Sequence, residues 1–134
     1  MKQCILIIDD NRAMSTFLFH LLGDSHEVIT KESAEEAVNW LNDQNIPNLI
    51  ISDYELEGIS GYQLLKLLKS SVSYQAIPFL MLSGKSKVDY RVECLQAGAE
   101  EFVLKPFNPA ELKLRVERIL QSRLNKSVGK ISAQ

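Results

Sequence analysis

The sequence predicts an α/β fold in which a parallel β-sheet is covered by helices on both faces. Short apolar runs alternate along the chain with longer segments whose apolar residues recur every three or four positions. An uninterrupted apolar run is typical of a strand that is buried on both faces. Regular alternation of strands and helices indicates a parallel sheet, because parallel neighbours need a helical crossover between them.

Five strands are expected, each followed by a helix. The strands are predicted at 3–8, 27–30, 48–52, 79–83 and 101–104. The helices are predicted at 12–22, 34–43, 62–70, 88–97 and 109–124. Ser33 with Glu36 three residues later forms a capping-box pattern, and Asn108 before Pro109 marks the start of the last helix.

Length and composition fit one globular domain with an apolar core. The chain has 134 residues, of which 46% are hydrophobic and 24% charged. We assign residues 1–124 to this domain and 125–134 to a short polar tail. The apolar run near the N-terminus is too short for a signal peptide or a membrane span. Cys4 and Cys94 lie in patterns typical of reduced thiols.

We therefore expect a cytoplasmic protein with no membrane partner. The formal net charge is only −2, and no basic motif is present, so we expect no nucleic-acid partner either.

Four of the five expected strands end in, or are followed by, residues that carry chemistry. These residues are Asp9, Asp10, Asp53, Ser83 and Lys105. Taken singly, each has an ordinary explanation as a turn former, a cap or a solvated charge. However, the carboxyl ends of parallel strands meet at one edge of the sheet, where ligands bind in open α/β folds. Their joint occurrence therefore predicts a functional site.

The charge of three carboxylates at one edge of the sheet would be balanced by one ammonium and one divalent cation. Two unit charges about 4 Å apart repel by roughly 1 kcal/mol in water and by more in a partly buried site. Mg²⁺ prefers oxygen ligands, and the lack of His and Cys at the strand ends argues against zinc. A bound cation also lets a phosphoryl group approach a carboxylate. Asp53 stands alone between the aspartate pair and Lys105, so it is the expected nucleophile.

These residues and their spacing resemble the response-regulator receiver domain of two-component signalling. The resemblance rests on Asp9-Asp10 and on "LIISDYELEGISGYQLL" (49–65), "FLMLSG" (79–84) and "AGAEEFVLKPFNPAEL" (97–112). It covers residues 3–122 approximately. It implies a flavodoxin-like, doubly wound five-stranded sheet in the order 2-1-3-4-5 with five flanking helices. It also implies a stand-alone phosphoacceptor of a two-component system or phosphorelay, with no output domain in this chain.

The resemblance assigns roles to the strand-end residues. Asp53 would accept the phosphoryl group as an aspartyl-phosphate, Ser83 would hydrogen-bond that group, and Lys105 would pair with it. Ser83 and Phe102 would form the switch. Phe102 lacks a hydroxyl, so its switching has to rest on packing alone. The Lys105–Pro106 peptide matches one that is often cis in the family.

The same resemblance implies a Mg²⁺ cofactor. Asp10 would ligate it directly and Asp9 mainly through water. Asp53 and the backbone carbonyl of Glu55 would complete the protein ligands. Glu57 occupies a loop position where the family often has proline, which leaves the rigidity of that loop open.

Glu55 and Lys85 lie two residues after Asp53 and Ser83. The resemblance implies that both positions overhang the phosphoryl group and influence how water reaches it, so both residues are candidate modulators. One hypothesis is an ion pair between them that slows hydrolysis of the phosphoryl group. The alternative is two unrelated surface charges, since exposed pairs contribute only ~0–1 kcal/mol.

The implied phosphodonor is a histidine kinase or a histidine phosphotransfer protein. A downstream protein would bind the surface formed by helix 88–97, strand 101–104 and the last helix, and a homodimer is another option. The protein would catalyse only its own phosphorylation and dephosphorylation.

The alternatives are a haloacid-dehalogenase-like phosphatase and a phosphorylation-independent binding module. Turnover of a phosphomonoester would separate the phosphatase from the switch.

Overall fold

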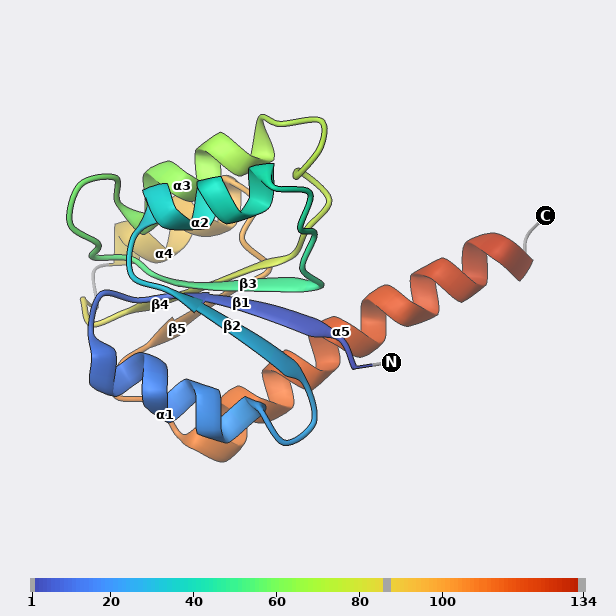
Figure 1. Cartoon of the computed structure of the whole chain (residues 1–134), viewed down its shortest axis with the longest axis horizontal. Coiled ribbons are helices and arrows are strands. Elements are labelled where there is room, and N and C mark those ends of the chain that lie inside the picture. Colours follow the sequence, from blue (N-terminus) through green and yellow to red (C-terminus); the bar gives the residue numbers. More distant parts are fainter. Residues whose placement is uncertain (1, 86–87, 133–134) are drawn as a thin grey trace.

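The computed structural model describes residues 2–85 and 88–132. Its centre is a parallel sheet with helices on both faces (Figure 1). The strands are β1 (Cys4–Ile8), β2 (Glu27–Lys31), β3 (Leu49–Asp53), β4 (Phe79–Ser83) and β5 (Glu101–Leu104). The helices are α1 (Arg12–Leu22), α2 (Ala34–Asn42), α3 (Gly61–Lys69), α4 (Val88–Gln96) and α5 (Pro109–Ser132). The strand order β2-β1-β3-β4-β5 confirms the predicted fold class and topology.

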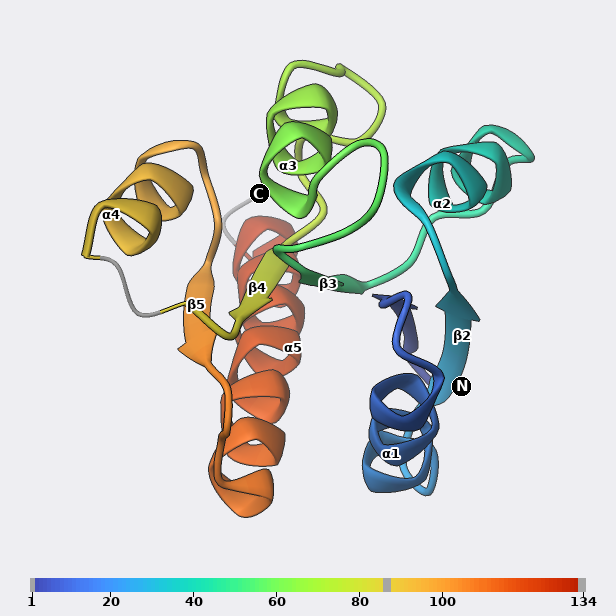
Figure 2. The ribbon, with the colours of Figure 1, turned by 90° about the vertical axis from the view of Figure 1, so that its left-hand side faces the viewer.

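The sheet separates two apolar cores. Helices α1 and α5 cover one face, and α2, α3 and α4 cover the other (Figure 1 and Figure 2). Alternate residues of β1 serve the two cores: Ile5 and Ile7 pack on the α1 and α5 side, and Leu6 and Ile8 on the opposite side. All four are fully buried, and burial of one such side chain contributes roughly 2 kcal/mol. This two-sided burial explains why the strands are continuous apolar runs.

Three elements run further than the sequence predicts. β2 extends by one residue to Lys31, which pairs with Ile8 of β1. β3 extends to Asp53, because that residue continues the ladder opposite Leu82 of β4. α5 continues to Ser132 instead of ending near Leu124, and it projects past one edge of the sheet (Figure 1). The segment proposed as a polar tail is therefore helical as far as residue 132, and residues 133–134 lie outside the described residues. None of the helices within 2–85 and 88–132 is long and apolar enough to cross a bilayer.

Side-chain caps fix where the helices begin. Ser33 Oγ accepts from the Glu36 N–H as predicted, but the Glu36 carboxylate accepts from the Glu32 N–H, one residue before the cap. A complete capping box opens α3 instead, where Ser60 and Gln63 satisfy each other's backbone N–H groups. The start of α3 is thereby fixed after the loop that leaves β3.

Candidate functional site

The sheet brings the predicted strand-end residues to one edge. β3 ends at Asp53, β4 ends at Ser83, and Lys105 follows β5. Asp9 and Asp10 follow β1, the neighbour of β3 on its other side. Chain order reverses between β1 and β3, which makes this edge the switch point where open α/β sheets bind ligands.

Asp9, Asp10 and Asp53 form a group that fits a metal ion. Carboxylate oxygens of the three lie within 4.8 Å of one another. Asp9 and Asp53 are 1% and 5% exposed, whereas Asp10 is exposed. Asp9 Oδ2 is buried and accepts no hydrogen bond from any residue that the structure describes, and such an acceptor is costly unless another group satisfies it. This oxygen-only donor set fits Mg²⁺.

Lys105 balances part of the negative charge. Its Nζ donates a hydrogen bond to Asp53 Oδ1 at 3.0 Å and lies 3.5 Å from Asp9 Oδ2. The Lys105–Pro106 peptide bond is cis, as the resemblance implied. One ammonium beside three carboxylates leaves an excess of negative charge, which a divalent cation would cancel.

The buried carboxyls are harder to ionise than usual. Burial raises the pKa of Asp53 to about 6, although its hydrogen bond to Lys105 acts in the opposite direction. Burial also raises the pKa of Asp9, which the Asn11 N–H and Lys105 offset only in part. For Lys105 itself, burial acts to lower the pKa, but its hydrogen bond to Asp53 and the charge of Asp9 outweigh burial and raise it. A bound cation would favour both ionised carboxylates.

The Ser83 hydroxyl is already engaged. Its Oγ lies 3.1 Å from Glu55 Oε1, to which it donates, and it accepts from the Lys85 N–H at 3.1 Å. Ser83 is fully buried. The ion pair of one hypothesis, between Glu55 and Lys85, is not found among the ion pairs of the described residues; the Glu55 carboxylate contacts Ser83 instead.

The loop between β3 and α3 is held by carboxylates from elsewhere in the fold. The Glu57 N–H donates to Asp10 Oδ2, and the Ile59 N–H donates to Glu35 Oε1, each at 3.3 Å. Gly58 between them has φ +77°, a conformation that glycine adopts without strain. These two bonds connect the loop to Asp10 and to Glu35 of α2. Our sequence analysis missed Glu35, because no local pattern links a residue of α2 to this loop.

Phe102 is buried in the core on the α2, α3 and α4 side of the sheet. Beside this core, the Tyr54 ring stacks on Tyr90 with centroids 4.9 Å apart and planes at 24°. The residue that follows Asp53 therefore contacts α4 directly. No sequence pattern indicates this contact, because the two tyrosines lie on different elements. The switch role of Phe102 stays a prediction.

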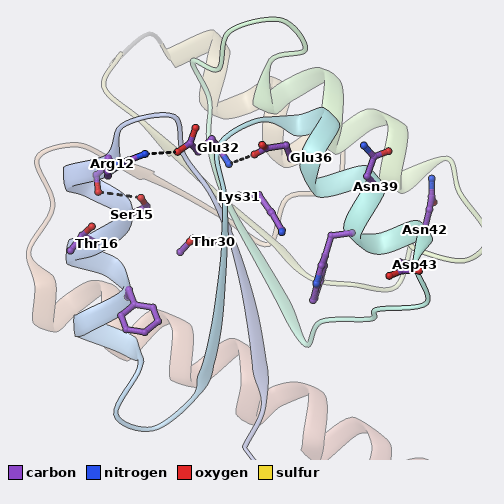
Figure 3. A pocket seen from close by; sticks show the side chains of 12 residues that line it. Arg12, Ser15, Thr16, Thr30, Lys31, Glu32, Glu36, Asn39, Asn42 and Asp43 are labelled. Atoms are coloured by element: carbon purple, nitrogen blue, oxygen red, sulfur yellow. Dashed lines mark hydrogen bonds and ion pairs between the residues drawn. The ribbon is translucent and has the colours of Figure 1, made fainter.

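A pocket of about 850 Å³ lies between α1, β2 and α2 (Figure 3). Arg12 pairs with Glu32 at 3.4 Å across it, and Thr30 and Lys31 of β2 line it. Its lining mixes both signs of charge and includes none of the strand-end residues of the candidate site.

The chain is similar in sequence to known proteins. The family model of the response regulator receiver domain matches residues 5–117. The phosphate regulon transcriptional regulatory protein PhoB of Klebsiella pneumoniae is 34% identical over 122 residues, which cover 90% of this chain and 53% of that protein. Histidine kinase P4 of Formosa agariphila is 34% identical over 123 residues, which cover 92% of this chain and 9% of that protein. The chain thus spans about half the length of one relative and a small part of the other.

A solved structure shows the same fold. The signal receiver domain of a signal transduction histidine kinase from Syntrophus aciditrophicus superposes with a TM-score of 0.82 at 30% identity, covering 90% of this chain and 91% of that one. The family model, the strand order and the acidic edge of the sheet agree. The chain belongs to the response regulator receiver domain family and is a receiver domain of two-component signalling.

Proposed function

We propose that Asp53 is the phosphoacceptor of this receiver domain and that Ser83 and Lys105 assist it. The observation that carries the proposal is the position of the Lys105 ammonium, 3.0 Å from Asp53 Oδ1 and 3.5 Å from Asp9 Oδ2. Phosphoryl transfer to a carboxylate needs positive charge around the transferring oxygens. A lysine and a cation at one buried carboxylate supply that charge.

In the transfer, a carboxylate oxygen of Asp53 attacks the phosphorus of a phosphohistidine on a partner protein. The new P–O bond forms as the P–N bond breaks, and the imidazole nitrogen keeps the electron pair and takes a proton from solvent. With a pKa of about 6, Asp53 is mostly ionised at pH 7 and able to attack. Lys105 then pairs with the phosphoryl oxygens, and the Ser83 hydroxyl donates to one of them.

The residues that would hold Mg²⁺ are Asp10 directly, Asp9 mainly through water, Asp53, and Glu55 through its backbone carbonyl. When bound, the cation supplies the charge neutralisation that lets an anionic phosphoryl group reach an anionic carboxylate. The unsatisfied Oδ2 of Asp9 and the exposed position of Asp10 support this assignment.

We extend the proposal to the output surface formed by α4, β5 and α5. Phosphorylation would draw Ser83 toward the phosphoryl group and repack Phe102, which shifts the population between two arrangements. Val92, Leu95 and Leu104 expose apolar side chains on this surface and suit a protein partner. The phosphodonor would be a histidine kinase or a phosphotransfer protein. A second copy of the chain is the alternative to a downstream protein.

Lys85 is a proposed modulator of the phosphoryl lifetime. Its backbone N–H donates to Ser83, which places the residue beside the site, and the residue is exposed. If it restricts water there, Lys85→Ala shortens the lifetime of the aspartyl-phosphate. An unchanged lifetime would remove this role.

The deciding experiment is intact mass spectrometry after incubation with Mg²⁺ and a small-molecule phosphodonor. The wild-type chain is expected to gain the mass of one phosphoryl group only when Mg²⁺ is present, and Asp53→Asn is expected to gain none. Asp24→Asn, which removes an exposed carboxylate from a turn, is the matched control and should behave as wild type. A gain of mass that persists in Asp53→Asn would contradict the proposal.

A further inference from the structure

The hydroxyl that should assist phosphoryl binding is directed elsewhere in this structure. Ser83 Oγ lies 3.1 Å from Glu55 Oε1, and 3.3 Å from the backbone oxygen of Lys85. It accepts a hydrogen bond from the Lys85 N–H at 3.1 Å. One of its two acceptor positions is therefore in use, and its single proton faces two competing oxygens.

A serine hydroxyl has a single proton to donate. The Glu55 oxygen is the nearer acceptor and is charged, and hydrogen bonds to ionised acceptors are roughly twice as strong as neutral ones. Ser83 is fully buried, so no bulk water replaces a lost partner. The proton of Ser83 is thus directed to Glu55.

We propose that the Glu55 side chain is a latch on Ser83: it holds the hydroxyl in the unphosphorylated protein and must release it before Ser83 can donate to a phosphoryl oxygen. This inference rests on the proposed phosphoacceptor role of Asp53. Both the Glu55 carboxylate and the phosphoryl group are anionic acceptors for the same proton, so they compete for it. The competent arrangement is then only partly populated, and the apparent affinity for the phosphoryl group is the intrinsic affinity multiplied by the populated fraction.

Glu55 has a second way to oppose an incoming anion, which is direct charge repulsion without any role for Ser83. The two explanations predict different behaviour when Ser83 is removed. A latch acts only through the hydroxyl, whereas repulsion persists in its absence. A double-mutant cycle on Glu55 and Ser83 separates them.

The test uses beryllofluoride, a non-hydrolysable phosphoryl analogue that bonds to a carboxylate, titrated in the presence of Mg²⁺ and followed by the ¹⁹F signal of the bound form. Glu55→Ala is expected to tighten binding about tenfold, the size of a lost charge-assisted hydrogen bond. Glu55→Gln keeps an uncharged acceptor, so its effect should be intermediate. In a Ser83→Ala background, Glu55→Ala should change nothing.

Glu57→Ala is the matched control, since it removes an exposed carboxylate from the same loop and keeps the backbone N–H that contacts Asp10.

Equal tightening of binding by Glu55→Ala with and without Ser83 would overturn the latch in favour of repulsion. No tightening by Glu55→Ala would overturn the latch as well. If Ser83→Ala binds beryllofluoride too weakly to measure, Glu55→Gln distinguishes the latch from repulsion. Repulsion alone predicts that Glu55→Gln and Glu55→Ala tighten binding equally. Failure of the proposed function would look different. In that case the wild type would show either no ¹⁹F signal of bound beryllofluoride or a signal that persists in Asp53→Asn.

Discussion

Lys105 donates a hydrogen bond to Asp53 at 3.0 Å and so ties the end of β5 to the end of β3 across β4. Even with this partner, burial raises the pKa of Asp53 to about 6. The protein therefore keeps an ionised carboxylate in a place that penalises its charge. This arrangement favours ligands that bring positive charge to the site, and it costs stability while none is bound.

The first prediction is that Asp53→Asn stabilises the metal-free protein at neutral pH. A carboxyl whose folded pKa is raised from 3.8 to about 6 binds its proton more tightly in the folded state. Its ionisation therefore costs up to about 3 kcal/mol at pH 7, a cost that disappears as the pH falls through 6 toward 4. Urea unfolding with a chelator present should show Asp53→Asn more stable than wild type at pH 7.5, with the gap closing at pH 4.5. A less stable variant at pH 7.5 would contradict the electrostatic reading of the cluster.

The second prediction concerns the metal. Mg²⁺ at ten times its dissociation constant should add about 1.4 kcal/mol to the free energy of unfolding, which raises Tm by about 4 °C in a domain of this size. Asp10→Asn removes an exposed member of the carboxylate group and should abolish the increase. Asp24→Asn, in the turn between α1 and β2, is the control that should keep it. Thermal unfolding with and without the ion measures the difference. An equal increase in all three proteins would place Mg²⁺ outside the acidic cluster.

A third prediction follows from a close backbone approach at the start of α3. A Cβ added to Gly61 would collide with the backbone oxygen of Asp53 and lie 3.0 Å from Met81 Sδ. Because backbone atoms cannot give way cheaply, Gly61→Ala should destabilise the fold by about 2 kcal/mol and displace Asp53. At Gly84 a Cβ would meet no atom within 4 Å, so Gly84→Ala is the matched control for stability. Chemical unfolding of both variants tests this, and equal stabilities would mean that α3 shifts away without cost.

Much of the site follows from sequence because strand ends are easy to locate. Asp9, Asp10, Asp53 and Lys105 directly end or follow apolar runs, and a parallel sheet brings such ends to one edge whatever the details of packing. These positions depend only on periodicity and topology. The family resemblance then supplies the strand order, which local patterns alone do not determine.

Contacts between side chains from distant segments could not be predicted from the sequence. Glu55 reaches Ser83 rather than Lys85, and Glu35 reaches the loop after β3, because rotamers and loop paths depend on tertiary packing. The end of α5 differs from the predicted end for another reason. A polar segment is equally compatible with a solvated helix and with a coil, so the sequence contains no stop signal near Leu124.

The last prediction concerns His26, on the far side of the molecule from the acidic edge. Its Nε2 is buried and has no hydrogen-bond partner among the residues that the structure describes. Burial lowers its pKa; Glu117 of α5 acts against that shift, and Lys113 of α5 and Lys2 act with it. The unfolded chain therefore takes up a proton near pH 6.5 that the folded protein resists.

The free energy of unfolding should accordingly fall as the pH drops below about 6.5, in the opposite direction to the contribution of Asp53. His26→Gln removes the titrating group and should make the unfolding free energy less sensitive to pH between 7 and 5 than in the wild type. His20→Gln, at an exposed position of α1, should leave the wild-type profile in place. Urea unfolding of the three proteins across this range measures the slopes. If His26→Gln keeps the wild-type slope, the imidazole gains its proton in the folded state as readily as in the unfolded chain, and burial of Nε2 does not penalise its charge.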